Sequence, residues 1–106
     1  MQIEFDEHGC KPFFKKHRQQ KELIKESINT AVEREIATGM TKVKVATKKK
    51  IAKQTIYEFP LNLGKLGSAR LAFSATQNRV IIYFISSHLQ KSTFNHEFEQ
   101  VIDKIG

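Results

Sequence analysis

The chain has 106 residues, of which 40% are hydrophobic and 27% charged, so residues 1–106 are expected to form a single domain with one core. The longest unbroken apolar run is residues 80–85, far short of the about 20 that a membrane-spanning helix needs. The N-terminus lacks the basic and long apolar segments of a secretion signal, and a single cysteine, Cys10, excludes an internal disulfide. These features predict a cytoplasmic protein with no membrane segment.

The net charge of +7 is distributed unevenly along the chain. Residues 1–35 hold seven acids and seven bases, whereas residues 36–96 hold ten bases and one acid, Glu58. A segment of one sign attracts polyanions such as nucleic acids. The alternative is that Lys48–Lys50 and their neighbours form a solvated loop whose charge only keeps the protein soluble.

The first third of the chain reads as a strand followed by helix. Residues 2–6 alternate polar and apolar, which is typical of a half-buried strand. Gly9 is expected to break the chain, and Pro12 suits the first turn of a helix that ends at Gly39. The apolar face of this helix is predicted to be Leu23, Ile24, Ile28, Ala31, Val32 and Ile36. Two helices joined by a turn near residues 19–20 and one continuous helix both fit this pattern.

The second half changes to the period of strands. Predicted strands are a short lysine-bearing edge strand at 43–45, then 55–59, 69–75, and the wholly apolar 80–85, which should lie inside the sheet. Pro60 should end its strand or mark a sheet edge, and Gln77 and Asn78 suit a tight turn.

The C-terminal segment has the clearest helical pattern. Ser92 or Thr93 can cap it, and its apolar stripe must dock on the sheet or on a partner. The stripe consists of Phe94, Phe98, Val101, Ile102 and Ile105. The predicted fold class is therefore α+β: an N-terminal strand, one or two helices, a small, mainly antiparallel sheet of three to four strands, and a C-terminal helix.

The residue types argue against several kinds of chemistry. The four histidines, His8, His17, His88 and His96, lack the spacing of a zinc site. A phosphate-binding glycine loop and the glycine-flanked serine of hydrolases are both absent from the sequence. Cys10 has no base beside it in the sequence and is expected to be a small buried residue. We therefore expect neither a metal nor a cofactor.

What remains is a set of groups suited to cleaving RNA without a metal. In that reaction a base removes the proton of the 2′-hydroxyl, a guanidinium such as Arg70 stabilises the phosphate, and an acid such as His88 or His96 protonates the leaving 5′-oxygen. The alternatives are that Arg70 only forms a salt bridge with Glu58 and that His96 only faces solvent.

Three segments of the second half resemble the RelE/ParE superfamily of bacterial toxins from type II toxin–antitoxin systems. They are Ile56-Tyr57-Glu58-Phe59-Pro60-Leu61, Ala69-Arg70-Leu71-Ala72-Phe73 and the apolar strand from Asn78 to Ser86. The resemblance covers about residues 48–105.

The resemblance to the RelE branch implies a metal-independent endoribonuclease that cleaves mRNA on the ribosome. Arg70 would contact the phosphate, Glu58 would be the base, and His88 or His96 would act on the RNA. The residues expected to bind RNA are Lys48, Lys49, Lys50, Lys53, Lys65, Lys91 and Phe94. This chain departs from the family in having Glu58 and Pro60 where the best-known RelE enzymes carry lysines.

Two other functions remain open at this point. The ParE branch inhibits DNA gyrase, and a homologue without catalysis that only binds nucleic acid or protein is also possible. In each toxin case the resemblance implies a cognate antitoxin, acidic and partly disordered, that covers the basic face or the apolar stripe of the C-terminal helix.

The most specific prediction from the sequence concerns the direction of the Arg70 side chain. It alternates with Leu71 and Phe73, so its side chain should leave the core on the open side of the sheet. The segment Lys48–Lys53 and the loop with His88 should converge there. Because Arg70 is expected to be exposed, its replacement by alanine should cost little stability.

Overall fold

Five strands form one mixed sheet in the computed structural model, which describes residues 2–105. The elements are β1 (Gln2–Phe5), α1 (Glu7–Lys16), α2 (Lys21–Ala37), β2 (Lys44–Ile51), β3 (Gln54–Asn62), β4 (Ser68–Ala75), β5 (Arg79–Ser86) and α3 (Lys91–Val101). The strand order is β1-β5-β4-β3-β2, with β1 parallel to β5 and the other pairs antiparallel. The predicted α+β class and order of elements are confirmed.

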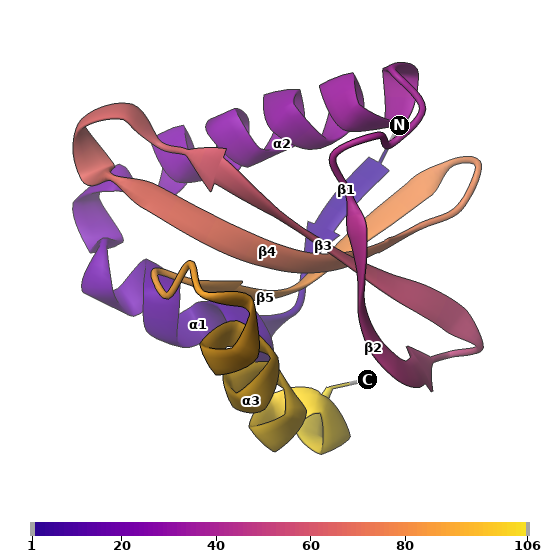
Figure 1. Ribbon diagram of the computed structural model, residues 1–106. Helices are drawn as coiled ribbons and strands as arrows, with labels where there is room; N and C mark the ends of the chain where they lie inside the picture. Colours follow the sequence, from indigo (N-terminus) through magenta and orange to yellow (C-terminus); the bar gives the residue numbers. More distant parts are fainter. Residues whose placement is uncertain (1, 106) are drawn as a thin grey trace.

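Helices cover both faces of the sheet (Figure 1). On one face, α1 and α2 pack on β4 and β5 through a cluster that includes Phe13, Ile28 and Phe73. On the other face, the buried rings of α3 pack on Phe84. Strand residues alternate between faces, so β3, β4 and β5 each contribute to both clusters. No helix within residues 2–105 is long and apolar enough to cross a bilayer.

Helix α1 begins at Glu7, five residues before the predicted start at Pro12. The carboxylate of Asp6 accepts a hydrogen bond from the Gly9 backbone N–H at 3.1 Å and caps the helix. Gly9 does not break the chain, because it lies inside the helix against β5. A Cβ atom at this position would be 1.6 Å from the carbonyl oxygen of Tyr83, so only glycine lets the helix lie this close to the strand.

Of the two readings of the helical region, the helix pair is the one observed. A short 3-10 turn at Arg18–Gln20 separates α1 from α2. The chain leaves α2 through Gly39, whose φ of 85° is a left-handed conformation that suits glycine. Leu23 was expected on the apolar face but is 64% exposed. The buried face is centred on Ile24 and Ile28, one turn apart, and Leu23 lies too far around the helix to reach it.

The edge strand β2 is longer than predicted and includes Lys48–Lys50, which therefore do not lie in a loop. A bulge interrupts its pairing with β3 between Val45 and Lys50. Beyond Glu58, β3 pairs only with β4, so Pro60 lies where β3 itself has become an edge. Pro60 thus marks an edge without ending its strand. Proline has no backbone N–H to donate, and within residues 2–105 no strand lies beside β3 at this point to accept such a hydrogen bond on the β2 side.

The apolar stripe of the C-terminal segment docks on the sheet. Phe94 and Phe98 are fully buried, and Ile102 and Ile105 are nearly so. Gln90 precedes the first turn of α3 without a side-chain capping bond, so the predicted caps are wrong. The stripe is therefore part of the core and cannot be the surface that a partner covers.

Candidate functional site

A buried carboxylate lies between two cations on the face of the sheet that α3 covers. Glu58, in β3, has no exposed surface. Its Oε1 atom accepts hydrogen bonds from Arg70 Nη1 and from Lys91 Nζ, each at 2.9 Å. Its Oε2 atom is also buried and has no hydrogen-bond partner within residues 2–105. Charge-assisted bonds of this length are the strong class of hydrogen bond, so both cations stabilise the Glu58 carboxylate in its buried position.

Arg70 is fixed by its strand and by a loop. It lies in β4, paired with Pro60 on one side and Ser86 on the other. Its Nε donates to the carbonyl oxygen of Leu89 at 2.9 Å, and its side chain is only 14% exposed. The expectation that Arg70 leaves the sheet towards solvent is wrong, because Glu58 and the Leu89 carbonyl hold its guanidinium against the sheet. The salt bridge with Glu58 that the alternative describes is present.

Besides Arg70 and Lys91, this face holds a third cation, Lys44. Lys91 begins α3, and its ammonium also donates to the Val45 carbonyl oxygen at 3.3 Å, which ties α3 to β2 and β3. Its side chain is 45% exposed. Lys44 lies directly opposite Glu58 in the β2–β3 pairing, so the two side chains share a face. We name Lys44, Glu58, Arg70 and Lys91 the carboxylate cluster, which has a formal charge of +2 from three cations and one anion.

His88 lies in the loop that also supplies the Leu89 carbonyl, but its ring faces α3. Its Nδ1 is 2.9 Å from Glu97 Oε1, which also accepts a hydrogen bond from Ser86 Oγ at 2.8 Å. The backbone N–H of His88 donates to Ser86 Oγ at 3.0 Å. The ring is more than half exposed and lines a shallow hollow of about 300 Å³ between α1 and α3. His88 is thus beside the carboxylate cluster in the chain, but no direct bond joins its ring to it.

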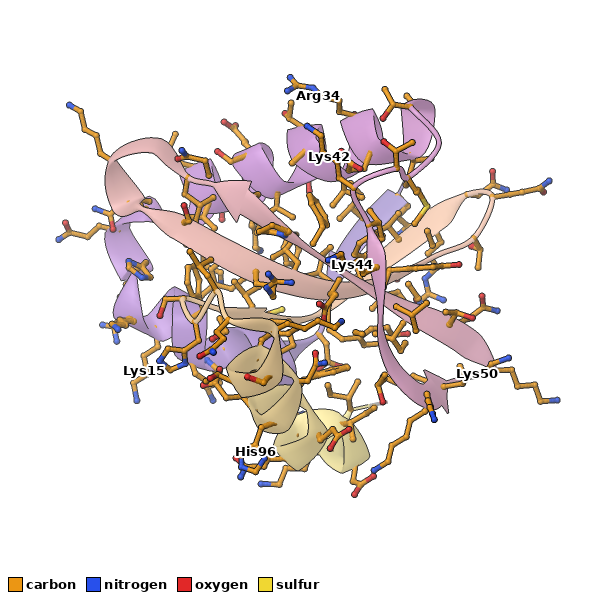
Figure 2. All side chains as sticks on the ribbon, in the orientation of Figure 1. Lys15, Arg34, Lys42, Lys44, Lys50 and His96 are labelled. Atoms are coloured by element: carbon orange, nitrogen blue, oxygen red, sulfur yellow. The ribbon has the colours of Figure 1, made fainter. Side chains whose placement is uncertain are left out.

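His96 is not brought to the carboxylate cluster. It lies on the exposed side of α3, where Figure 2 shows it projecting away from the sheet. Its Nε2 atom lies 3.2 Å from Nε2 of Gln100, one turn further along the helix. Of the two histidines that the sequence suggested, His88 is therefore the better placed.

The predicted RNA-binding lysines are exposed but spread along the molecule. Lys48, Lys49 and Lys50 lie on β2, Lys53 lies in the turn to β3, and Lys65 lies in the loop after β3. Figure 2 shows Lys44 over the middle of the sheet and Lys50 near the far end of β2. Six residues of strand span about 20 Å. The expected convergence of Lys48–Lys53 on Arg70 is therefore wrong, because the strand carries these lysines away from Arg70. Lys91 shares the Glu58 oxygen with Arg70, and Lys44 lies opposite Glu58.

Two further expectations concern buried residues. Phe94 cannot stack on RNA in this structure, because its ring has no exposed surface and packs on Phe84 and Phe98 at centroid distances of 5.3 and 6.4 Å. Cys10 is buried as predicted, and its Sγ donates to the Ile82 carbonyl oxygen at 3.4 Å. Burial raises the pKa of the Cys10 thiol to about 12, so it is protonated at neutral pH and a poor nucleophile.

Sequence reasoning missed Lys44 and the link between Ser86, His88 and Glu97. Lys44 could be found only from the β2–β3 register, which a bulge makes irregular. Within residues 2–105, no three His, Cys, Asp or Glu side chains gather closely enough to hold a metal ion. Comparison of the chain with models of protein families, with curated proteins and with solved structures finds no match.

Proposed function

We propose that the protein is a toxin of the RelE type that cleaves mRNA without a metal, on the ribosome, at the carboxylate cluster. The observation that carries this proposal is the buried carboxylate of Glu58, held by Arg70 and Lys91 at 2.9 Å each with Lys44 opposite. A base flanked by phosphate-binding cations is the arrangement that RNA cleavage through the 2′-hydroxyl requires.

In the proposed reaction, Arg70 and Lys91 bind the scissile phosphate and Glu58 is the base. The 2′-hydroxyl gives its proton to Glu58 Oε2, the oxygen that lacks a partner. The 2′-oxygen then bonds to phosphorus, the bond from phosphorus to the 5′-oxygen breaks, and His88 donates a proton to the leaving 5′-oxygen. Because Glu58 has no exposed surface, Lys91 must turn outward to the phosphate and uncover the carboxylate. The Lys91 side chain, 45% exposed, has the freedom to do this.

A second candidate is a binding module without catalysis, such as a ParE-like inhibitor of gyrase. It is favoured by the same burial of Glu58 and by the two bonds that hold Arg70, because a purely structural salt-bridge network has these features. In this case the exposed lysines of β2 would contact the target, and the carboxylate cluster would only join α3 to the sheet.

Transcript mapping after induction in bacteria separates the two candidates. The wild-type protein is expected to produce cuts at fixed codon positions, and Glu58→Gln, which keeps the shape of the side chain, should reduce cutting at least about tenfold. Glu33→Gln, at an exposed position on α2, is the matched control and should cut normally. Urea unfolding of each variant excludes misfolding as the cause. Growth arrest with intact transcripts and a DNA-damage response would favour the ParE-like candidate.

The proposal includes a cytoplasmic location and a cognate antitoxin that is acidic and partly disordered. Since the stripe of α3 is buried, the antitoxin would have to cover the exposed lysines of β2, the edge strand of the sheet. Co-expression with the neighbouring open reading frame should restore growth and yield a stable complex. If growth is not restored and no complex co-purifies, the toxin–antitoxin proposal loses this support.

A further inference from the structure

A second basic site lies on the opposite face of the sheet, between α1 and α2. A cavity of about 500 Å³ opens there, with the rings of Phe5 and Phe14 and the thiol of Cys10 among its walls. Its walls also include five cations from the two helices: Lys11, Lys15, Arg18, Lys21 and Lys25. Figure 2 shows Lys15 projecting from α1 at the edge of the molecule.

The charges of this cavity are not balanced from within. Asp6 and Glu7 also line it, but five cations against two acids leave a formal charge of +3. In the described part of the chain, none of the five cations has a carboxylate within 4.0 Å. The Asp6 carboxylate already accepts the capping bond from Gly9, and the Cys10 thiol is uncharged at neutral pH. Cations gathered without counter-charges repel one another, and a bound anion relieves that repulsion.

Two of these lysines are held in place by the aromatic walls. The Lys25 ammonium lies 5.3 Å from the centroid of the Phe5 ring and 5.7 Å from that of Phe14. The Lys21 ammonium lies 5.5 Å from the Phe14 centroid. Cation–π contacts of this kind order long side chains and bring positive charge next to an apolar surface. The cavity therefore combines cations with flat apolar walls.

We infer that this cavity binds a 5′-phosphorylated nucleotide, with the phosphates on the lysines and Arg18 and the base against the half-buried ring of Phe5, beside the largely buried Phe14. The volume lies within the range of about 300–1,000 Å³ for small-molecule sites. The lysine ammonium groups would move from the ring faces to the phosphates, which frees those faces for the base. The nucleotide can be a free nucleoside polyphosphate or the 5′ end of an RNA chain, since both present the same chemistry.

Calorimetric titration of the full chain tests this site. The probes are ATP, inorganic tripolyphosphate, and one short RNA prepared with a 5′-triphosphate or a 5′-hydroxyl. ATP is expected to bind at least about tenfold more tightly than tripolyphosphate, because only ATP contacts the aromatic walls. Tighter binding of the 5′-triphosphate RNA than of the 5′-hydroxyl RNA assigns the site to RNA ends, and equal binding of the two RNAs assigns it to free nucleotides. Equal affinity for ATP and tripolyphosphate would overturn the assignment to a nucleotide.

Lys15 and Lys16 are neighbours on α1 and, together with Lys25 on α2, provide the variants that locate the site. Lys15→Gln combined with Lys25→Gln should weaken ATP binding at least about tenfold. Lys16→Gln, one residue away on the side of α1 that faces the hollow near His88, should leave it within about twofold. Arg70→Ala, in the carboxylate cluster, should also leave it unchanged, which keeps this site distinct from the proposed cleavage site. If the double variant binds ATP as the wild type does, the cavity is not the site and the inference is wrong.

Discussion

Glu58 and Arg70 form a buried ion pair, and the proposed function also assigns chemistry to both residues. A carboxylate without exposed surface is stable only if cations compensate its lost hydration, and here two cations share one of its oxygens. Removing either Arg70 or Lys91 leaves the buried Glu58 carboxylate with one compensating cation instead of two. Any loss of activity in a variant of this pair must therefore be separated from loss of folding.

Arg70→Ala should lower the free energy of unfolding by about 3 kcal/mol, because it breaks a buried ion pair and frees the Leu89 carbonyl. This reverses the expectation from the sequence that the change would cost little. Urea unfolding at pH 7 measures the effect. Arg79→Ala is the matched control, since Arg79 pairs with Glu4 at an exposed site, and it should lower the free energy of unfolding much less than Arg70→Ala does. Equal losses in the free energy of unfolding for both variants would show that the buried Arg70–Glu58 pair stabilises the protein no more than an exposed pair does.

The Cys10 thiol predicts a pH dependence of stability. Burial raises its pKa from 9.0 to about 12, so between these values the unfolded chain loses the thiol proton while the folded chain keeps it. Unfolding then releases a proton, and stability should fall as pH rises above 9 by up to about 1.4 kcal/mol per pH unit. Below pH 9 this contribution should be constant. Unfolding free energies of the wild type and of Cys10→Ala, compared from pH 8 to 10.5, should diverge only above pH 9. Parallel curves would contradict the predicted shift.

At the scale of elements, periodicity predicted the kinds of elements correctly and their ends less well. The alternation in β4 and the apolar run of β5 are local properties of a strand, so the sequence alone contains them. The start of α1 depends on Gly9 lying against the Tyr83 carbonyl, which is a contact between distant parts of the chain. Patterns within a single sequence therefore reveal the local properties of a strand, but they do not reveal contacts between distant parts of the chain.

The same distinction applies to the two candidate sites. The pairing of Arg70 with Glu58 could be anticipated, because both lie on predicted strands of one sheet. Lys44 could not, because a bulge in β2 shifts the register on which its position depends. The basic cavity between α1 and α2 could not be predicted from the sequence, because residues 1–35 have no net charge. Folding places five of their bases but only two of their acids around the cavity, and this separation can be seen only in the three-dimensional structure.

The contact of α1 with β5 gives a prediction at this scale. Gly9→Ala would improve helix propensity in an isolated helix by about 1 kcal/mol. In the folded protein it should instead cost at least about 3 kcal/mol, because the added Cβ would overlap the Tyr83 carbonyl oxygen and force α1 away from the sheet. Thermal unfolding and soluble yield measure the loss. Gly39→Ala, where nothing lies within 4 Å, is the control and should cost only about 1 kcal/mol from its positive φ. A stable Gly9→Ala protein would contradict the close packing of α1.

For the molecule as a whole, positive charge occurs on both faces of the sheet, but in different forms. On one face the five cations surround a cavity of about 500 Å³ that suits a compact anion. On the other, the carboxylate cluster continues into exposed lysines along the edge strand β2, which suits an extended one. The proposed cleavage function therefore assigns a single strand of RNA to β2, and the inferred nucleotide site assigns a compact ligand to the helix pair.

This division predicts how salt affects RNA binding. If β2 contacts about four phosphates of single-stranded RNA, the logarithm of the binding constant should fall with the logarithm of salt concentration with a slope of about −3. Replacing Lys48, Lys49 and Lys50 together by Gln should bring the slope to about −1, because three counterion-releasing contacts are lost. Fluorescence anisotropy with a 5′-hydroxyl RNA, which lacks the phosphates expected at the helix cavity, isolates β2 from that site. The Lys15→Gln, Lys25→Gln double variant should keep the full slope. If it loses the slope and the β2 variant keeps it, the RNA runs over the helix pair and the carboxylate cluster is a structural salt-bridge network.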